Sequence, residues 1–248
     1  MKQIVGRKMG MTQVFAKDGT NYPVTVIEVL PNVVIQVKTV AKDGYSAVQV
    51  GIEDAKESSL NNPQKGIWKK NNLAPKKYLF EIKCDDAESL AVGSEIKADV
   101  FQPGDIIDVV GTTKGHGYSG TIQRWNMKIG PKGHGASGPH RLQGSFANNG
   151  RTNNRVIPGK HMSGHYGNES CTIQNALIVD SNVEKGYILV RGGVPGAKYS
   201  FVTLKTAYKT AFGQKEVVKE LHKVEKPVLK EEKIQEAPVN ETTNAEVK

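Results

Sequence analysis

The segment from Gly111 to Gly167 contains no aspartate or glutamate, and this absence constrains the fold more than any other feature of the sequence. Five of the chain's six histidines and half of its 26 glycines lie in this segment, together with few leucines, isoleucines or valines. Such a segment cannot bury enough apolar surface to offset the entropy of ordering its backbone, roughly 1 to 2 kcal/mol per residue. We therefore expect a partner outside the chain to order it.

The acid-free segment carries nearly all of the excess positive charge, +8 of a formal net charge of +9. Its fixed cations are Lys114, Arg124, Lys128, Lys132, Arg141, Arg151, Arg155 and Lys160, and its histidines are His116, His134, His140, His161 and His165. Like charges without neighbouring carboxylates repel one another and favour a polyanionic partner, for which nucleic acid is the leading candidate. Trp125 adds a ring face on which an unpaired base can stack. We expect all of these side chains to contact RNA. A plain flexible linker is the alternative, but linkers rarely carry Trp, Met and several histidines.

A short repeat lies within this segment, at Lys114–Gly120 and again at Lys132–Gly138, and each copy contains the pattern G-x-G-x-x-G. A dinucleotide-binding loop would need an acidic residue about 20 positions later, whereas the next carboxylate after the first copy belongs to Glu169. A kinase would need the strings H-R-D and D-F-G, and neither occurs. Glycine does let a backbone pass close to phosphate oxygens. The glycines expected to approach RNA in this way are Gly115, Gly117, Gly120, Gly133, Gly135 and Gly138.

The sequence on both sides of the acid-free segment is typical of β-strands. Asp18-Gly19 and Asp43-Gly44 each separate two runs rich in Val, Ile and Tyr, which is a strong hairpin signal. The expected strands are 13–16, 22–30, 32–41, 45–52, 78–83, 100–111, 171–179, 187–191 and 199–207, with one short helix at 64–71. Strands on both sides favour a single sheet closed into a barrel, which leaves no exposed edge strands. The predicted fold is mainly β: a closed antiparallel β-barrel with a long irregular basic extension and a small helical insertion.

This fold divides the chain into three parts. Residues 1–110 and 168–213 together form the barrel domain, with a small helix-containing insertion at about 53–90, and residues 111–167 form the basic, Gly-rich extension, hereafter the arm. Residues 214–248 are rich in Lys and Glu, and we expect a charged tail that is largely disordered. Within the tail, Val217, Leu221 and Val224 have the spacing of a short amphipathic helix.

Two further features have less specific meanings. Trp68 lies among several lysines, which form either a solvated face or an accessory RNA contact: Lys65, Lys69, Lys70, Lys76 and Lys77. Cys84 and Cys171 have no C-x-x-C partner, so we expect two buried, apolar cysteines in a reducing compartment and no zinc site or disulfide framework. No apolar run is long enough for a signal peptide or a membrane span, so we expect a soluble, cytoplasmic protein.

Several blocks of sequence resemble the universal large-subunit ribosomal protein "L three" family, bacterial type. The blocks are residues 6–15, a stretch from Phe101 to Arg124, and residues 140–145, 159–164, 167–169 and 192–196. The resemblance implies a barrel of the translation-protein type whose arm threads into large-subunit ribosomal RNA toward the peptidyl transferase centre. It also implies binding early in subunit assembly, neighbouring ribosomal proteins as partners, and no catalytic residues, cofactor, small-molecule substrate or membrane. Some bacterial members carry a methylated glutamine where this chain has Asn148, so we do not expect that modification here.

The sequence leaves two alternatives to a ribosomal protein. The first is a dissociable RNA-binding translation or assembly factor on a similar barrel. The second is an enzyme that uses His161 and His165, four residues apart, as a metal pair, or Cys171 as a nucleophile. Ser163 and Gly164 disfavour a helix between the two histidines, and the arm has no carboxylate to complete a metal site or to orient an imidazole. We therefore expect no catalytic and no metal-binding residues.

Overall fold

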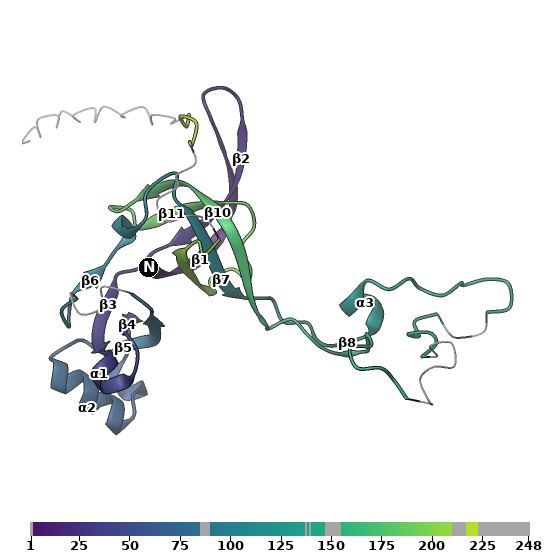
Figure 1. Cartoon of the computed structure of the whole chain (residues 1–248), viewed down its shortest axis with the longest axis horizontal. Coiled ribbons are helices and arrows are strands. Elements are labelled where there is room, and N and C mark those ends of the chain that lie inside the picture. Colours follow the sequence, from purple (N-terminus) through teal and green to yellow (C-terminus); the bar gives the residue numbers. More distant parts are fainter. Residues whose placement is uncertain are drawn as a thin grey trace, which may run out of the picture.

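A computed structural model describes residues 2–84, 90–136, 138, 140–146, 155–209 and 217–222 of the chain. Its centre is a closed barrel of antiparallel strands in the order β1-β12-β7-β10-β11-β2 (Figure 1). The barrel strands are β1 (Gln3–Phe15), β2 (Asn21–Glu28), β7 (Ile106–Thr112), β10 (Ser170–Asn182), β11 (Tyr187–Arg191) and β12 (Phe201–Thr206). The prediction of a mainly β fold with a closed antiparallel barrel is confirmed.

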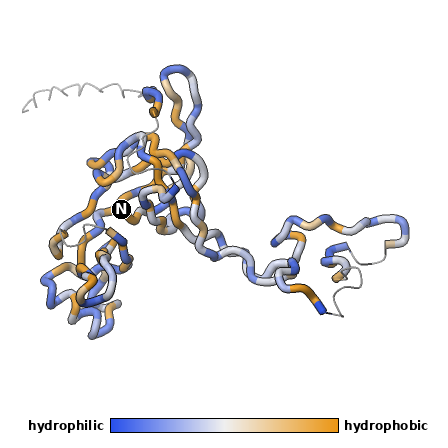
Figure 2. The backbone as a smooth tube through the Cα atoms, viewed as in Figure 1, coloured by the Kyte–Doolittle hydropathy of each residue, from blue (hydrophilic) through white to orange (hydrophobic). Residues whose placement is uncertain are grey.

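The barrel is filled by β-branched and leucine side chains that alternate along the strands. Ile4 of β1, Ile107 of β7, Ile178 of β10 and Leu204 of β12 are fully buried in one hydrophobic cluster. Successive residues of a strand point to opposite faces, so every second residue of each strand enters this core. The barrel strands are accordingly rich in hydrophobic residues, whereas the arm on the right of Figure 2 is mainly hydrophilic.

A second, smaller sheet lies beside the barrel, in the order β5-β4-β3-β6. Its elements, with the helices next to them, are β3 (Asn32–Lys38), α1 (Val40–Asp43), β4 (Ala47–Asp54), the 3-10 turn η1 (Glu57–Ser59), α2 (Asn62–Asn71), β5 (Lys76–Ile82), β6 (Glu95–Ile96) and the 3-10 turn η3 (Ala98–Val100). The prediction of one single sheet is therefore wrong. Strands β3 and β4, expected in the barrel meander, pair with each other and with β6 and β5 instead.

Strand β1 belongs to the barrel, but its two faces pack into the cores of both sheets. Ile4 enters the barrel core, whereas its neighbour Val5 packs in the core of the second sheet. Asn32, at the start of β3, is buried and its side-chain amide donates a hydrogen bond of 3.1 Å to the carbonyl of Val5. Phe201 of β12 contacts the ring of Phe80 at a centroid distance of 5.2 Å. Both sheets therefore use ordinary hydrophobic strands, and only their pairing differs.

The division of the chain into a barrel (1–110 and 168–213), an arm and a tail remains a proposal. We extend the insertion in it from about 53–90 to about 32–96, since these residues span the second sheet. In Figure 1 the insertion and the arm leave the barrel on opposite sides.

Three smaller expectations have mixed outcomes. The predicted hairpin at Asp18-Gly19 is present, and Gly19 has the left-handed φ of 82° that such turns favour. The strands on either side of Asp43-Gly44 also pair, but α1 joins them in place of a tight turn and replaces the strand expected at residues 40–41, and Gly44 caps this helix with a φ of 83°. Cys84 is half-buried and Cys171 is exposed on β10, so the prediction of two buried cysteines is wrong. Most of the tail, including Val224, lies outside the described residues, but residues 217–222 are described and are extended rather than helical. No helix in the described ranges is long and apolar enough to span a membrane.

Candidate nucleic-acid interface

The base of the arm continues two barrel strands without a break. Strands β7 and β10 pair as far as Thr112 and Ser170, and the ladder is extended by hydrogen bonds between Thr113 and Glu169. The amide of Thr113 donates to the carbonyl of Glu169 at 2.9 Å, and the amide of Glu169 donates to the Thr113 hydroxyl at 3.1 Å. Gly167 then has a φ of +76°, and a Cβ there would collide with the carbonyl of Lys114. The two halves of this stalk, residues 112–114 and 167–170, are therefore in direct backbone contact at Gly167.

Beyond the stalk the chain forms a short two-stranded ribbon of β8 (Gly117–Ser119) and β9 (Gly164–Tyr166). His116 stacks on Tyr166 with ring centroids 4.8 Å apart, and its amide donates a 2.8 Å hydrogen bond to the Tyr166 carbonyl. The hydroxyls of Tyr118 and Ser163 lie 2.8 Å apart on the same ribbon. The part of the arm next to the barrel, from the stalk through β8 and β9 (hereafter the proximal arm), thus has internal hydrogen bonds. The expectation that the whole arm takes its order from outside was too broad.

A helical turn, α3 (Thr121–Trp125), follows the ribbon and brings together three predicted RNA-binding residues. The rings of Trp125 and His161 stack at a centroid distance of 4.0 Å and an interplanar angle of 6°. The Arg124 guanidinium lies 5.0 Å from the centre of the Trp125 ring. Trp125 and Arg124 both donate to the carbonyl of Met162, at 2.9 and 3.3 Å. These contacts join the outgoing and returning halves of the arm, and they link residues 36 to 38 positions apart in the chain.

The two copies of the glycine repeat adopt different conformations. In the first copy, Gly117 and Ser119 belong to β8 and pair with the returning strand. The described residues of the second copy, 132–136 and 138, pair with no strand and lie in a loop whose ends are joined by a 2.9 Å hydrogen bond from the Gly130 amide to the His140 carbonyl. His134 within it has a φ of +56°, a left-handed conformation that its counterpart His116, just before β8, lacks. The same residues therefore form a strand or a loop according to whether a partner strand is available.

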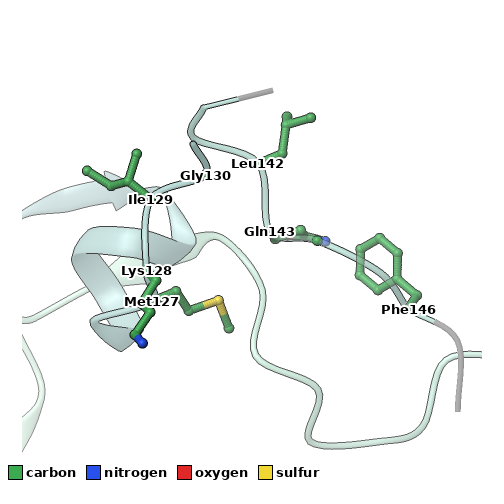
Figure 3. Close-up of a pocket in the computed structure, with 8 residues that line it drawn as sticks. Met127, Lys128, Ile129, Gly130, Leu142, Gln143 and Phe146 are labelled. Atoms are coloured by element: carbon green, nitrogen blue, oxygen red, sulfur yellow. The ribbon is translucent and has the colours of Figure 1, made fainter. Parts of the chain in front are cut away.

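The distal arm also carries apolar side chains around an open cavity of about 620 Å³, shown in Figure 3. The lining residues are Met127, Lys128, Ile129, Gly130, Leu142, Gln143, Gly144 and Phe146. Leu142 is 69% exposed, Ile129 is 46% exposed and Phe146 is 39% exposed, and because they line one cavity they form an apolar patch rather than singly exposed side chains. This apolar surface was not recognised from the sequence, because its residues are scattered singly among glycines and lysines.

The charged residues of the arm lie at its surface. The exposed members of the predicted set are Lys114, His116, Trp125, Lys128, Lys132, His134, Arg141, Arg155, Lys160, His161 and His165. Arg124 and His140 are half-buried, and the His140 ring lies 3.0 Å from the carbonyl oxygen of Pro131. Arg151 lies outside the described residues, as does Asn148. In the described part of the arm no cation forms an ion pair with a carboxylate, as expected for a segment without Asp or Glu.

The predicted backbone-approach glycines stand in open space, unlike the glycines of the stalk. A Cβ at Gly117, Gly120, Gly133, Gly135 or Gly138 would meet no atom of the protein within 4 Å, and one at Gly115 would meet Asn168 only at 3.6 Å. A Cβ at Gly164 would collide with the Arg124 side chain. Internal packing therefore explains the stalk glycines and leaves the six others free to approach an external surface.

The geometry does not favour an enzyme. His161 stacks on Trp125, whereas His165 lies in β9 opposite Tyr118, so the two imidazoles do not share one face of a helix. Among the described residues no group of three His, Cys, Asp or Glu side chains could hold a metal ion.

Lys8 of β1, at the base of the arm, was missed by sequence reasoning. Its ammonium donates to the carbonyls of Val194 and Gly196 at 2.6 and 3.0 Å. Burial, and secondarily the charge of Lys114, lower the pKa of Lys8. The loop 192–196 that Lys8 holds also packs against Gly111, where a Cβ would lie 3.0 Å from Pro195. The sequence pattern around Lys8, which lies between Gly6 and Gly10 in β1, does not indicate that Lys8 holds this loop.

Comparison with known proteins identifies relatives along most of the chain. A family model described as ribosomal protein L3 matches residues 79–183. The protein is 46% identical over 214 residues to large ribosomal subunit protein uL3 of Lactobacillus helveticus. The aligned residues cover 86% of this chain and 99% of that protein. This chain is 50% identical over 208 residues to uL3 of Latilactobacillus sakei (84% and 97%), and 49% identical over 210 residues to uL3 of Halalkalibacterium halodurans (84% and 99%).

Proposed function

Because this chain belongs to the ribosomal protein L3 family, we propose that its arm binds large-subunit ribosomal RNA. Membership of this family makes the protein a non-enzymatic structural constituent of the large ribosomal subunit, ribosome-bound in the cytoplasm. One observation carries this proposal. The arm leaves the barrel on a hydrogen-bonded stalk and exposes cations that have no carboxylate partner in the described residues. Exposed like charges of this density repel one another and attract a polyanion.

The proximal and distal arm have different roles in this proposal. Arg124, Trp125 and His161 already contact one another, so they fix the direction of the arm and offer RNA only their outer edges. The distal cations meet phosphate oxygens, and the open glycines let the backbone follow the RNA closely. The exposed side chains of Leu142 and Phe146 add apolar surface that splayed bases can cover.

We further propose that the arm points toward the peptidyl transferase centre, that the barrel contacts neighbouring ribosomal proteins, and that binding occurs early in subunit assembly. The distal arm supports the timing. Its described residues make few hydrogen bonds beyond the loop closure at Gly130 and His140, so most of its order comes from its host. An arm of this kind is placed more readily while the RNA around it is still folding than into a finished subunit.

The salt dependence of RNA affinity tests the proposal. If all eight fixed cations of the arm neutralise phosphates, log Kd against log salt has a slope of at most roughly 6 to 7 for a large-subunit ribosomal RNA fragment. Replacing Lys128, Lys132 and Arg141 together by Gln should lower the slope by roughly 2 to 3.

A matched control replaces three lysines of α2, Lys65, Lys69 and Lys70, by Gln. This control leaves the slope unchanged if those lysines form a solvated face, and lowers it if they form an accessory RNA contact. A slope near zero for the unmodified protein would refute RNA binding by the arm. Equal effects of the two triple variants would show that the arm is not the principal binding site.

The alternative role, a dissociable RNA-binding translation or assembly factor, is distinguished by sedimentation. A structural constituent remains in the large-subunit fraction when cell lysate is sedimented in high salt. Release of the protein into the supernatant would favour the factor.

A further inference from the structure

The barrel has a hydrophobic patch on its outer face. On β11, Ile188 enters the barrel core and its neighbour Leu189 points to the opposite face, yet both are buried. On β2, Ile27 enters the core whereas Val24, also fully buried, belongs to the outer cluster with Tyr22. A barrel wall needs an apolar inner face only, and its outer face is ordinarily solvated. The buried outer patch therefore requires a cover.

Part of that cover is residues 217–222 of the C-terminal tail, hereafter the strap. Val218 and Leu221 of the strap pack against the outer cluster, beside Ala16 at the end of β1. Residues Tyr22, Val24, Val179 and Leu189 of the barrel wall form the floor of this cluster. The strap thus closes a second, smaller hydrophobic layer outside the barrel.

The strap attaches to the β1–β2 hairpin as an added strand. Ala16 and Leu221 form an antiparallel bridge, which is flanked by two backbone hydrogen bonds of 2.8 Å: from the Lys17 amide to the Glu220 carbonyl and from the His222 amide to the Phe15 carbonyl. Strand β12 pairs with β1 only between Gln3 and Arg7, so this part of the β1 edge is available to another strand. Strand addition to an exposed edge is a common mode of peptide recognition.

Two ion pairs determine the register of the added strand. Lys219 of the strap lies 2.5 Å from the Asp18 carboxylate and also donates to the Thr20 hydroxyl, and Lys17 of the hairpin lies 2.7 Å from Glu220. Exposed pairs of this kind contribute little to stability. Their signs alternate, however, so pairing Lys17 with Lys219 or Asp18 with Glu220 would bring like charges together. The charges therefore select one register while Val218 and Leu221 supply the burial.

We propose that the β1–β2 hairpin and the apolar outer face of β2, β10 and β11 form a strand-binding site whose occupant is the chain's own C-terminal strap. In this arrangement the strap seals the outer face of the barrel against other partners. The site is independent of RNA binding, since no predicted RNA-binding residue takes part in it.

A cysteine pair in the full-length chain tests the proposal. The two flanking hydrogen bonds make Ala16 and Leu221 a non-hydrogen-bonded antiparallel pair, whose Cα atoms are about 4.5 Å apart and within the range of a disulfide. With Cys84 and Cys171 replaced by Ser, the variant carrying Ala16→Cys and Leu221→Cys should form an intramolecular disulfide in air. The matched control carries Ala16→Cys and Val217→Cys, because Val217 is 90% exposed and lies outside the bridge. Equal rates of disulfide formation in the two variants would overturn the proposal.

Amide exchange of Lys17 in the chain with its native cysteines is a second readout that needs no buried replacement. The Lys17 amide should be protected, and Leu221→Asp should speed its exchange at least about tenfold by placing a charge in the outer cluster. Lys219→Asp should have a smaller effect, and Asp18→Lys combined with it should restore protection. An exchange rate that Leu221→Asp leaves unchanged would also overturn the proposal.

Discussion

Replacing Gly167 with alanine should open the stalk of the arm. Gly167 has a φ of +76°, and a left-handed conformation costs an L-residue about 1 to 2 kcal/mol. In addition, the new Cβ would collide with the Lys114 carbonyl and lie 3.1 Å from the Cα of Gly115. Both neighbours are backbone atoms, so the clash is relieved only if the two halves of the stalk separate.

Separation would break the two hydrogen bonds donated by the backbone amides of Thr113 and Glu169. Each bond contributes about 1 kcal/mol to the stability of the stalk. Together with the conformational cost, the stalk loses about 3 to 4 kcal/mol. The Thr113 amide should then exchange with solvent roughly 10² to 10³ times faster, unless it first reaches the rate of an unstructured chain. Hydrogen exchange followed by NMR or mass spectrometry measures this rate directly.

Two other glycines of the same segment separate the contributions. Gly117 also has a positive φ, of 66°, but open space at its Cβ, so Gly117→Ala should show only the conformational cost, roughly 5- to 30-fold. Gly115 has neither a positive φ nor a close contact, so Gly115→Ala should leave the Thr113 amide unchanged. If Gly167→Ala accelerated exchange no more than Gly117→Ala, the backbone contact with Lys114 would not be what holds the stalk together.

Three further predictions address the distal arm, the strap and the barrel. Trypsin should cleave the RNA-free protein within residues 141–160 and leave the barrel intact, and ribosomal RNA should protect these sites; protection without RNA would contradict the proposed role of the host. The Lys219 hydrogen bond, followed by those from Thr20, lowers the pKa of Asp18 from 3.8 to about 2, so its stabilisation of the strap is complete above pH 3.8 and is lost as the pH falls through about 2. Exchange of the Lys17 amide should report this loss, and Asp18→Asn should lack it. Ile107→Ala should lower the free energy of unfolding by about 2 to 5 kcal/mol in denaturant titrations, because Ile107 is fully buried in the barrel.

Much of the barrel could be predicted because its strands carry local signals. The strand Tyr187–Arg191 and the hairpin at Asp18-Gly19 follow from β-branched residues bounded by turn residues. The first ten residues of β1 were missed, because Gly6 and Gly10 lower its strand propensity. Gly6 is nevertheless needed, since a Cβ there would lie 2.6 Å from Ile27. Which strands pair is a tertiary property, and the separate second sheet therefore could not be read from alternation alone.

The chemistry of the arm was readable from the sequence, whereas its internal structure was not. The missing carboxylates and the clustered glycines are features of composition, which can be read from the sequence alone. They predicted an arm with exposed cations, as the structure has it. The stack of Trp125 on His161 joins residues far apart in sequence, and no spacing rule anticipates it. The repeat at 114–120 and 132–138 shows the same limit, because an identical pattern forms a strand in one place and a loop in the other. The strap was also missed, because its apolar residues have helical spacing but pack on a strand edge.

Strands β7 and β10 run directly from the barrel into the arm, so the barrel holds the base of the arm. Ile107 sits in the barrel core and Thr112 in the stalk of one and the same strand, with no linker between them. A pull along the arm draws β7 and β10 in the same direction, so it is resisted in shear by their ladders with β12 and β11 rather than by the bonds between them. The base of the arm is therefore held in a fixed position relative to the barrel, and a displacement of the barrel also moves the stalk.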